Sequence, residues 1–178
     1  MKINSFHIFR FDVNNPQHVE FLWEKYNDAR YADFFRRIPK DLSETSLKSI
    51  ETITGAAFYP IYDSKGYLFA LAETSGIDPY ARSCDSGLLV DAKLFSDTLE
   101  GSLGEHVMRE VIDFLFKSTP LNKVSLRFLS SNKNIQDSCV RNKMSLQGVF
   151  EDGIFYQGAW HNEYEYSITR KTFYERVS

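Results

Sequence analysis

The residue types best suited to covalent or metal chemistry in this sequence are two cysteines and four histidines. The cysteines are Cys84 and Cys139, and the histidines lack the spacing of a metal-binding motif. A thiol with His106 or His161 as its base would make a cysteine hydrolase conceivable. No sequence signature of that chemistry surrounds either cysteine, so we expect neither a hydrolase nor a metal site.

Asp85 is the carboxylate with the most informative surroundings. It lies in the segment 84–91, which reads as a strand and ends in the apolar run Leu88–Val90. A continuous apolar run is typical of a strand that is buried on both faces. A carboxylate partly withdrawn from water at such a place can act as a general base. Two structural alternatives remain open, since Asp85 could instead cap a strand bulge or pair with Arg82.

A long amphipathic helix is predicted directly after this strand, over residues 101–117. Leu103, Val107, Val111 and Phe114 recur on one of its faces. The unpaired N–H groups and the positive dipole end make a helix N-terminus a natural site for an anion. The alternative is an ordinary helix start with Ser102 as its cap.

The remaining periodicities predict a mixed chain of helices and strands. The order of elements favours an α+β fold in which helices flank a sheet with antiparallel hairpins, as one domain over residues 1–178. The predicted segments are a strand at 5–12, a helix opened by Asn15 and Pro16, a helical region from about Asp41 to Gly55, strands at 56–62 and 66–73, a loop at 75–82, a strand at 124–129, a short helix at 135–142, and a C-terminal hairpin with Gly158, His161 and Asn162 at its turn.

Composition excludes several classes of protein. The formal net charge is −3 and no basic stripe is visible, so no nucleic-acid partner is expected. No apolar run is long enough to cross a bilayer, so no membrane association is expected. The N-terminus lacks the apolar stretch of a signal peptide, and two cysteines form no disulfide framework. These features predict a cytoplasmic location.

The order of elements and the C-terminal tail resemble the GNAT acyltransferase superfamily, and within it the ribosomal-protein alanine acetyltransferase-like branch. The tail residues that match are Gln147-Gly148, Ile154-Phe155-Tyr156, His161-Asn162 and Tyr166-Ser167-Ile168. The resemblance covers nearly the whole chain. It implies a mixed, mostly antiparallel sheet of about six or seven strands flanked by helices. It also implies acetyl-CoA as the cosubstrate.

In this family the pantetheine arm of acetyl-CoA pairs with an exposed strand backbone, which the resemblance places at Leu88, Leu89 and Val90. The family's phosphate loop falls on six consecutive residues, namely Leu99, Glu100, Gly101, Ser102, Leu103 and Gly104. Only the last position matches well, because Ser102 replaces a glycine and Leu99 replaces a basic or amide residue. Glu100 and Glu105 would repel a pyrophosphate if they faced it.

Four further residues take roles from the same resemblance. Asn132 matches the family asparagine that contacts pantetheine, although a competing alignment selects Asn134 and either could simply cap a helix. Asp85 falls at a frequent carboxylate position. Cys139 falls where many members have a tyrosine acid, and Ser138 could hydrogen-bond the thioester sulfur. Cys139 could alternatively be a small core residue.

The leading hypothesis is an acetyl-CoA-dependent N-acetyltransferase that acts by direct transfer on a primary amine of a small molecule or a protein N-terminus. A second hypothesis is a catalytically degenerate binding module that kept the fold and has a weak or lost acetyl-CoA site. A third is the transfer of a longer acyl group, with the aromatic hairpin as an apolar wall. The same hairpin makes a homodimer plausible.

Overall fold

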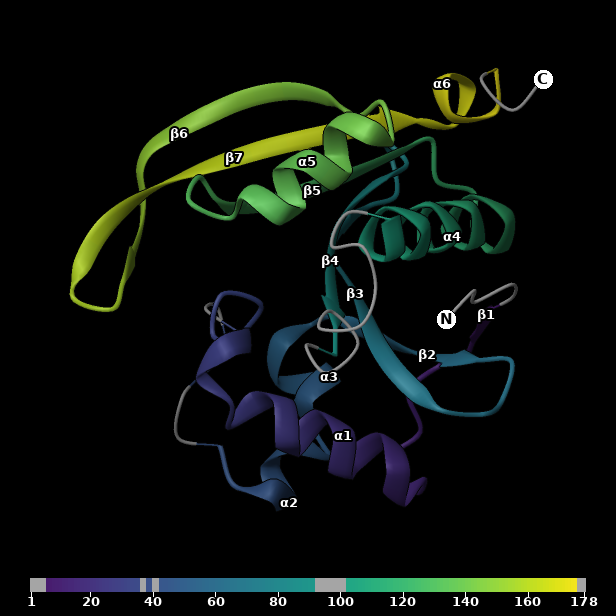
Figure 1. Ribbon diagram of the computed structural model, residues 1–178, viewed down its shortest axis with the longest axis vertical. Coiled ribbons are helices and arrows are strands. Elements are labelled where there is room, and N and C mark those ends of the chain that lie inside the picture. The colour runs from purple at the N-terminus through teal and green to yellow at the C-terminus, as the bar shows by residue number, and fades with distance from the viewer. Residues whose placement is uncertain (1–5, 36–37, 40–41, 92–101, 176–178) are drawn as a thin grey trace.

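The protein is built around one seven-stranded sheet flanked by helices (Figure 1). The computed structural model describes residues 6–35, 38–39, 42–91 and 102–175. The strand order is β1-β2-β3-β4-β5-β7-β6. The β4/β5 pair is parallel and every other neighbouring pair is antiparallel. The predicted α+β class, with a mostly antiparallel sheet of six or seven strands, is therefore confirmed.

The helices and strands follow one another in nearly the predicted order. They are β1 (Phe6–Ile8), α1 (Pro16–Tyr26), the 3-10 helix η1 (Ala29–Tyr31), α2 (Glu44–Leu47), α3 (Ile50–Thr54), β2 (Ala57–Asp63), β3 (Leu68–Asp78), β4 (Ser83–Val90), α4 (Ser102–Ser118), β5 (Lys123–Leu129), α5 (Lys133–Arg141), β6 (Ser145–Tyr156), β7 (Ala159–Thr169) and α6 (Arg170–Tyr174). None of the described helices is both long and apolar enough to span a bilayer.

Local signals explain where the first helices begin and end. The Asn15 side chain accepts a hydrogen bond from the amide of Gln17 at 3.0 Å, and Pro16 occupies the first helical position. Gly55 ends α3 with a φ of 64°, a conformation that glycine adopts without steric cost. The single helical region predicted before Gly55 is instead two short helices, α2 and α3.

Two predicted loop assignments were wrong. The segment 75–82 was expected to be a loop, but β3 continues to Asp78 because pairing with β4 extends to Ser83. His161 and Asn162 were expected at the hairpin turn, but both lie in β7. The turn is formed by Gln157 and Gly158, whose φ angles are 51° and 83°. Backbone conformation at this turn, rather than the polar His-Asn pair, sets its position.

The sheet has a hydrophobic cluster on each face. One cluster packs α4 against β3, β4, β5 and β7 through residues such as Val107, Val111 and Val124. The other packs α1 and the following segment against β2, β3 and β4 through residues such as Leu22, Phe58 and Leu89. Figure 1 shows α1, α2 and α3 together at one end of the molecule and α4 and α5 at the other.

We expect Val111→Asp to destabilise the protein by on the order of 3 kcal/mol, because it would place an unpaired charge in an apolar core. Val111 is 4% exposed and lies within the cluster under α4. Arg109→Asp, at an exposed position of the same helix, is the matched control and should change stability by less than about 1 kcal/mol. Urea unfolding of both variants measures the difference. Equal stability of the two would contradict the packing described for α4.

Candidate active site

The central feature of the site is a gap between the two parallel strands. The register of β4 with β5 runs from Ser83 opposite Lys123 to Ser86 opposite Leu126. Beyond these pairs β4 continues through 87–90 and β5 through 127–129. The two strands therefore diverge toward their carboxyl ends, and the second half of β4 has a neighbouring strand on its β3 side only.

The peptide groups of β4 alternate between its two sides. The amide of Asp91 donates to a β3 carbonyl at 2.8 Å, and Leu89 lies opposite Leu71. Hydrogen-bonded and non-hydrogen-bonded pairs alternate in an antiparallel ladder. Leu89 therefore pairs with β3, whereas the peptide groups of Leu88 and Val90 point into the gap. Of the three residues expected to hold a pantetheine arm, only Leu88 and Val90 present their backbone to the gap.

A cavity of about 600 Å³ occupies the gap and reaches both faces of the sheet. On the side of α4 and α5, its wall includes Gly104, Met108 and Ser138. On the side of α1 and α3, its wall includes Glu73 and Asp85. A ligand that enters along one face can therefore meet a second ligand from the other face through the gap.

On the α4 side, the structure separates two residues for which sequence reasoning proposed chemistry. Ser138 lines the cavity, and its hydroxyl donates to the carbonyl of Asn134 at 2.9 Å. Cys139 is fully buried in the core beneath α4 and does not line the cavity. Burial raises the pKa of its thiol to about 12. The proposed role of Cys139 as an acid is therefore wrong, because a thiol buried in the core cannot reach the leaving group of a ligand in the cavity.

The other cysteine has the same character. Burial, and then the charge of Asp85, raise the pKa of the Cys84 thiol to about 12. Neither cysteine supplies the thiolate that a hydrolase needs. Within the described part of the chain, no group of three or more His, Cys, Asp and Glu side chains could hold a metal ion.

The N-terminus of α4 opens toward the same cavity. Gly104 lines the cavity, and a methyl group at this glycine would lie 3.5 Å from the Ser138 hydroxyl. Ser102 is the first residue of α4, and the Leu103 side chain packs on the core. Leu99, Glu100 and Gly101, also proposed for the phosphate loop, lie outside the described residues.

The charge of Glu105 is partly compensated. Its carboxylate lies 4.0 Å from a guanidinium nitrogen of Arg141 on α5, and its backbone carbonyl accepts from the side chain of Asn142. These contacts direct Glu105 toward α5. The expected repulsion between Glu105 and a pyrophosphate is weakened by this neighbouring cation.

Asn132 caps a helix and also lines the cavity. Its side-chain oxygen accepts from the amide of Ile135 at 3.3 Å and so caps α5. Its side-chain nitrogen donates to Asp33 at 2.8 Å. Both Asn132 and Asp33 line the cavity, and so does Asn134, the competing candidate. The Asn132–Asp33 hydrogen bond ties the turn after β5 to the segment after η1.

On the opposite side of the sheet, the described part of the cavity wall carries three carboxylates, of Asp33, Glu73 and Asp85. Glu73 lies opposite Gly87 and Asp85 lies opposite Ser75, so the two acidic residues are diagonal neighbours on one face. Sequence reasoning identified Asp85 and missed the other two. Alternation along the strand predicted at 66–73 would have placed Glu73 on one face, but only the pairing with β4 brings it beside Asp85.

A glycine makes room for an aromatic wall over this face. A methyl group at Gly87 would lie 3.2 Å from the ring of Phe34, which is closer than side chains normally approach. Phe34 follows η1 and lines the cavity. The absence of a side chain at Gly87 therefore lets the Phe34 ring lie directly on β4, beside the Glu73 carboxylate.

The two arginines found among the described residues of the cavity wall are each held by a carboxylate. Arg30 donates to Asp28 at 3.0 Å, and hydrogen bonds from Arg30 lower the pKa of Asp28 to about 2. Arg127 contacts Glu165 at 2.7 Å. The positive charges of Arg30 and Arg127 are thus compensated locally by these two carboxylates.

Solved structures of other proteins share the fold described above. No family model and no curated protein matches the chain. A spermidine N-acetyltransferase from Vibrio cholerae in complex with CoA and spermine has a TM-score of 0.81 at 13% identity, covering 95% of this chain and 98% of that one. A dodecameric structure of spermidine N-acetyltransferase from Vibrio cholerae has a TM-score of 0.78, also at 13% identity, covering 97% of this chain and 98% of that one. At this level of identity the likeness concerns the fold, and the chain therefore has the GNAT fold of these N-acetyltransferases.

Proposed function

We propose that this protein is an acetyl-CoA-dependent N-acetyltransferase that transfers an acetyl group directly to a primary amine. The observation that carries the proposal is the unpaired edge of β4 inside a cavity that reaches both faces of the sheet. An extended pantetheine arm can hydrogen-bond such an edge as an added strand does. The thioester would then lie at the gap, with the amine approaching from the other face.

The donor would occupy the side of α4 and α5. The backbone of Leu88 and Val90 would bind the pantetheine arm, and the N-terminal turn of α4, which includes Gly104, would face the pyrophosphate. Ser138, beside Gly104 on the same side of the cavity, would hydrogen-bond the thioester sulfur by turning its hydroxyl away from the carbonyl of Asn134. Gly104, Met108 and Ser138 on this wall are small or apolar, which suits a narrow ligand of this kind.

The acceptor would occupy the side of α1 and α3. Three carboxylates on this wall suit a cationic amine, and the paired arginines do not oppose it. A protein with the same fold is known in complex with CoA and spermine, which supports a small amine-bearing molecule as the acceptor. A protein N-terminus is the alternative acceptor, suggested by the resemblance to the ribosomal-protein alanine acetyltransferase-like branch.

The chemistry requires two proton movements. Asp85, directly or through a water, would accept a proton from the ammonium, so that the amine nitrogen can form a bond to the acetyl carbon. The carbon–sulfur bond then breaks and the departing CoA thiolate takes up a proton. Glu73 would hold the cationic acceptor beside Asp85. No residue of this chain is assigned as the acid, since Cys139 is buried away from the cavity.

The test is calorimetry with acetyl-CoA, CoA and a longer acyl-CoA, followed by an assay for CoA release. We expect acetyl-CoA to bind with a dissociation constant below ~1 mM and CoA to be released in the presence of a di- or polyamine. Preference for the longer donor would favour transfer of a longer acyl group. Release with a peptide bearing a free N-terminus, and not with amines, would favour a protein acceptor.

A catalytically degenerate binding module is the second candidate. It is favoured by the departure of Leu99 and Ser102 from the family's phosphate-loop pattern. If no donor binds at millimolar concentration, this second candidate becomes the better description. A cytoplasmic location and a homodimer formed through the β6–β7 hairpin remain predictions.

A further inference from the structure

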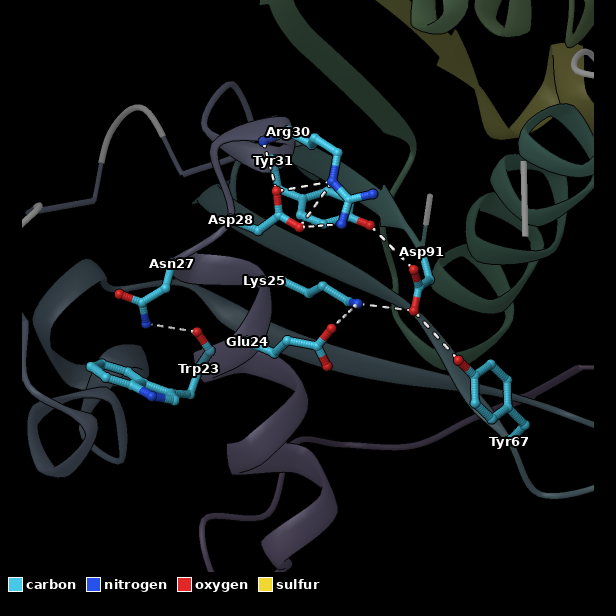
Figure 2. A network of polar contacts seen from close by, with 9 residues as sticks. All are labelled: Trp23, Glu24, Lys25, Asn27, Asp28, Arg30, Tyr31, Tyr67 and Asp91. Carbon is cyan, nitrogen blue, oxygen red and sulfur yellow. Dashed lines mark hydrogen bonds and ion pairs between the residues drawn. The ribbon is translucent and has the colours of Figure 1, made fainter. Parts of the chain in front are cut away.

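A fully buried lysine of α1 contacts the residue that follows β4. The Lys25 side chain has no exposed surface, and its ammonium lies 2.9 Å from Asp91 and 3.1 Å from Glu24 (Figure 2). The ammonium also lies 4.9 Å from the ring centre of Phe21 and 5.4 Å from that of Tyr31. A charge withdrawn from water is tolerated only when it is paired and hydrogen-bonded in this way.

The lysine stays charged in these surroundings. Burial by itself lowers the pKa of the Lys25 ammonium, but hydrogen bonds to Asp91 and Glu24 outweigh it and hold the pKa above its usual value. The stabilisation from the charged form is complete at neutral pH and is lost only as the pH rises through that raised pKa. The ion pair is therefore a constant feature of the protein near neutrality.

Asp91 is the point at which several elements meet. It directly follows β4, and its carboxylate accepts from the hydroxyls of Tyr31 at 3.3 Å and Tyr67 at 3.4 Å as well as from Lys25 (Figure 2). Its backbone amide donates to Phe69 on β3 at 2.8 Å. Contacts from α1, η1 and the start of β3 thus converge on the residue that directly follows β4.

This convergence lies where β4 lacks a neighbouring strand. Residues 87–90 run past the last β4/β5 pair, so the sheet supports them from the β3 side alone. A strand held on one side only can shift its free edge more easily than a central strand. An anchor on the side chain of Asp91 restrains that edge at its end.

The same network reaches the acceptor wall. Tyr31 lines the cavity and begins the segment that carries Asp33 and Phe34 to the acceptor side. Hydrogen bonds between charged side chains form only in particular relative orientations of the two groups, whereas apolar packing of equal stability has no such requirement. A Lys-Asp pair can therefore set the orientation of β4 relative to η1 in a way that a leucine pair would not.

We propose that Lys25 and Asp91 are positioning residues that hold the free end of β4, and with it the peptide groups of Leu88 and Val90, in the orientation that binds the acyl donor. The donor part of this statement rests on the proposed function. The part that concerns the strand stands without it.

Hydrogen exchange on two double variants tests the strand. Lys25→Met with Asp91→Leu removes both charges together, and Lys25→Met with Asp91→Asn keeps an acceptor for the tyrosines if the first variant fails to fold. The Leu89 amide, which pairs with β3, should exchange at least ~10-fold faster in either variant. The Val124 amide, which pairs with β7, should change less than ~2-fold.

Phe173→Ala is the matched control for lost stability. Phe173 is buried on α6, packed against Phe116 and away from the network. The Phe173→Ala variant should have a lower melting temperature, without a selective increase in the exchange rate of the Leu89 amide. Unchanged exchange at Leu89 in the double variants, or equal acceleration at Leu89 and Val124, would overturn the positioning role.

Donor binding is measured on the same variants. The dissociation constant of acetyl-CoA should rise at least ~10-fold in the double variants, a change of about 1.4 kcal/mol, and remain near the wild-type value in Phe173→Ala. Faster exchange at Leu89 with unchanged donor affinity would overturn the link to the donor. If the wild-type protein itself binds no acetyl-CoA, the proposed function fails, and the strand part is decided by Leu89 exchange alone.

Discussion

Gly104→Glu is expected to abolish binding of acetyl-CoA while leaving the fold intact. Gly104 lies in the first turns of α4 on the cavity wall, so a glutamate there would fill the donor side and add a negative charge. At 5–6 Å from a phosphate, that charge costs about 3 kcal/mol at an effective dielectric of about 20. Salt reduces the electrostatic part toward about 1 kcal/mol, since the screening length is only about 8 Å. The steric part does not depend on salt.

Gly104→Ala is the matched control for this change. A methyl group at Gly104 would make ordinary contact with the Ser138 hydroxyl at 3.5 Å, so donor affinity should stay near the wild-type value. Alanine also favours the helix by up to about 1 kcal/mol. Calorimetry and thermal unfolding of both variants separate binding from folding. Wild-type affinity in a folded Gly104→Glu protein would show that the donor lies elsewhere.

Asp85→Asn should lower the turnover number by roughly 10²–10⁴-fold, the usual contribution of a general base. Asparagine keeps the shape of the side chain and cannot take the proton of an ammonium. Acetyl-CoA affinity should change little, because Asp85 lies on the paired half of β4 and on the acceptor side of the cavity. Steady-state kinetics with an amine acceptor, together with donor calorimetry, measures both quantities.

Glu73→Gln tests whether Asp85, rather than the neighbouring carboxylate of Glu73, is the general base. Glu73 is the diagonal neighbour of Asp85 on the same face of the sheet. Its loss should raise the acceptor KM more than it lowers the turnover number, because its proposed role is to attract the cation. Asp78→Asn, at an exposed carboxylate, should change neither. An unchanged rate for Asp85→Asn near neutral pH, with a slow Glu73→Gln protein, would assign the base to Glu73.

The sequence by itself determined the elements whose causes are local. Asn15 and Pro16 specify the start of α1 through a side-chain cap and a fixed φ. The spacing of Val107 and Val111 specifies the buried face of α4, and Gly55 ends α3. Such signals act over a few residues, so they can be read before the chain is folded. The order of these elements was enough to identify the fold class.

Part of the candidate site was also predictable from what the resemblance to the GNAT superfamily implies. Asp85, Gly104, Asn132 and Ser138 all reach the cavity wall. Cys139 does not, although it is adjacent to Ser138 in the sequence. Successive residues of a helix point about 100° apart, so one can face the cavity while the next enters the core. The sequence identifies the helix but not which of its faces meets the gap.

Only the tertiary structure decided the features that depend on distant residues. Asp33 and Asn132 are 99 positions apart, and Lys25 and Asp91 are 66 apart. The gap at β4 depends on where pairing with β5 stops, which no local pattern encodes. The physical reason is that burial, charge pairing and strand divergence are properties of side chains and strand edges brought together by folding. Local propensity acts within a few residues and does not determine which distant residues will meet.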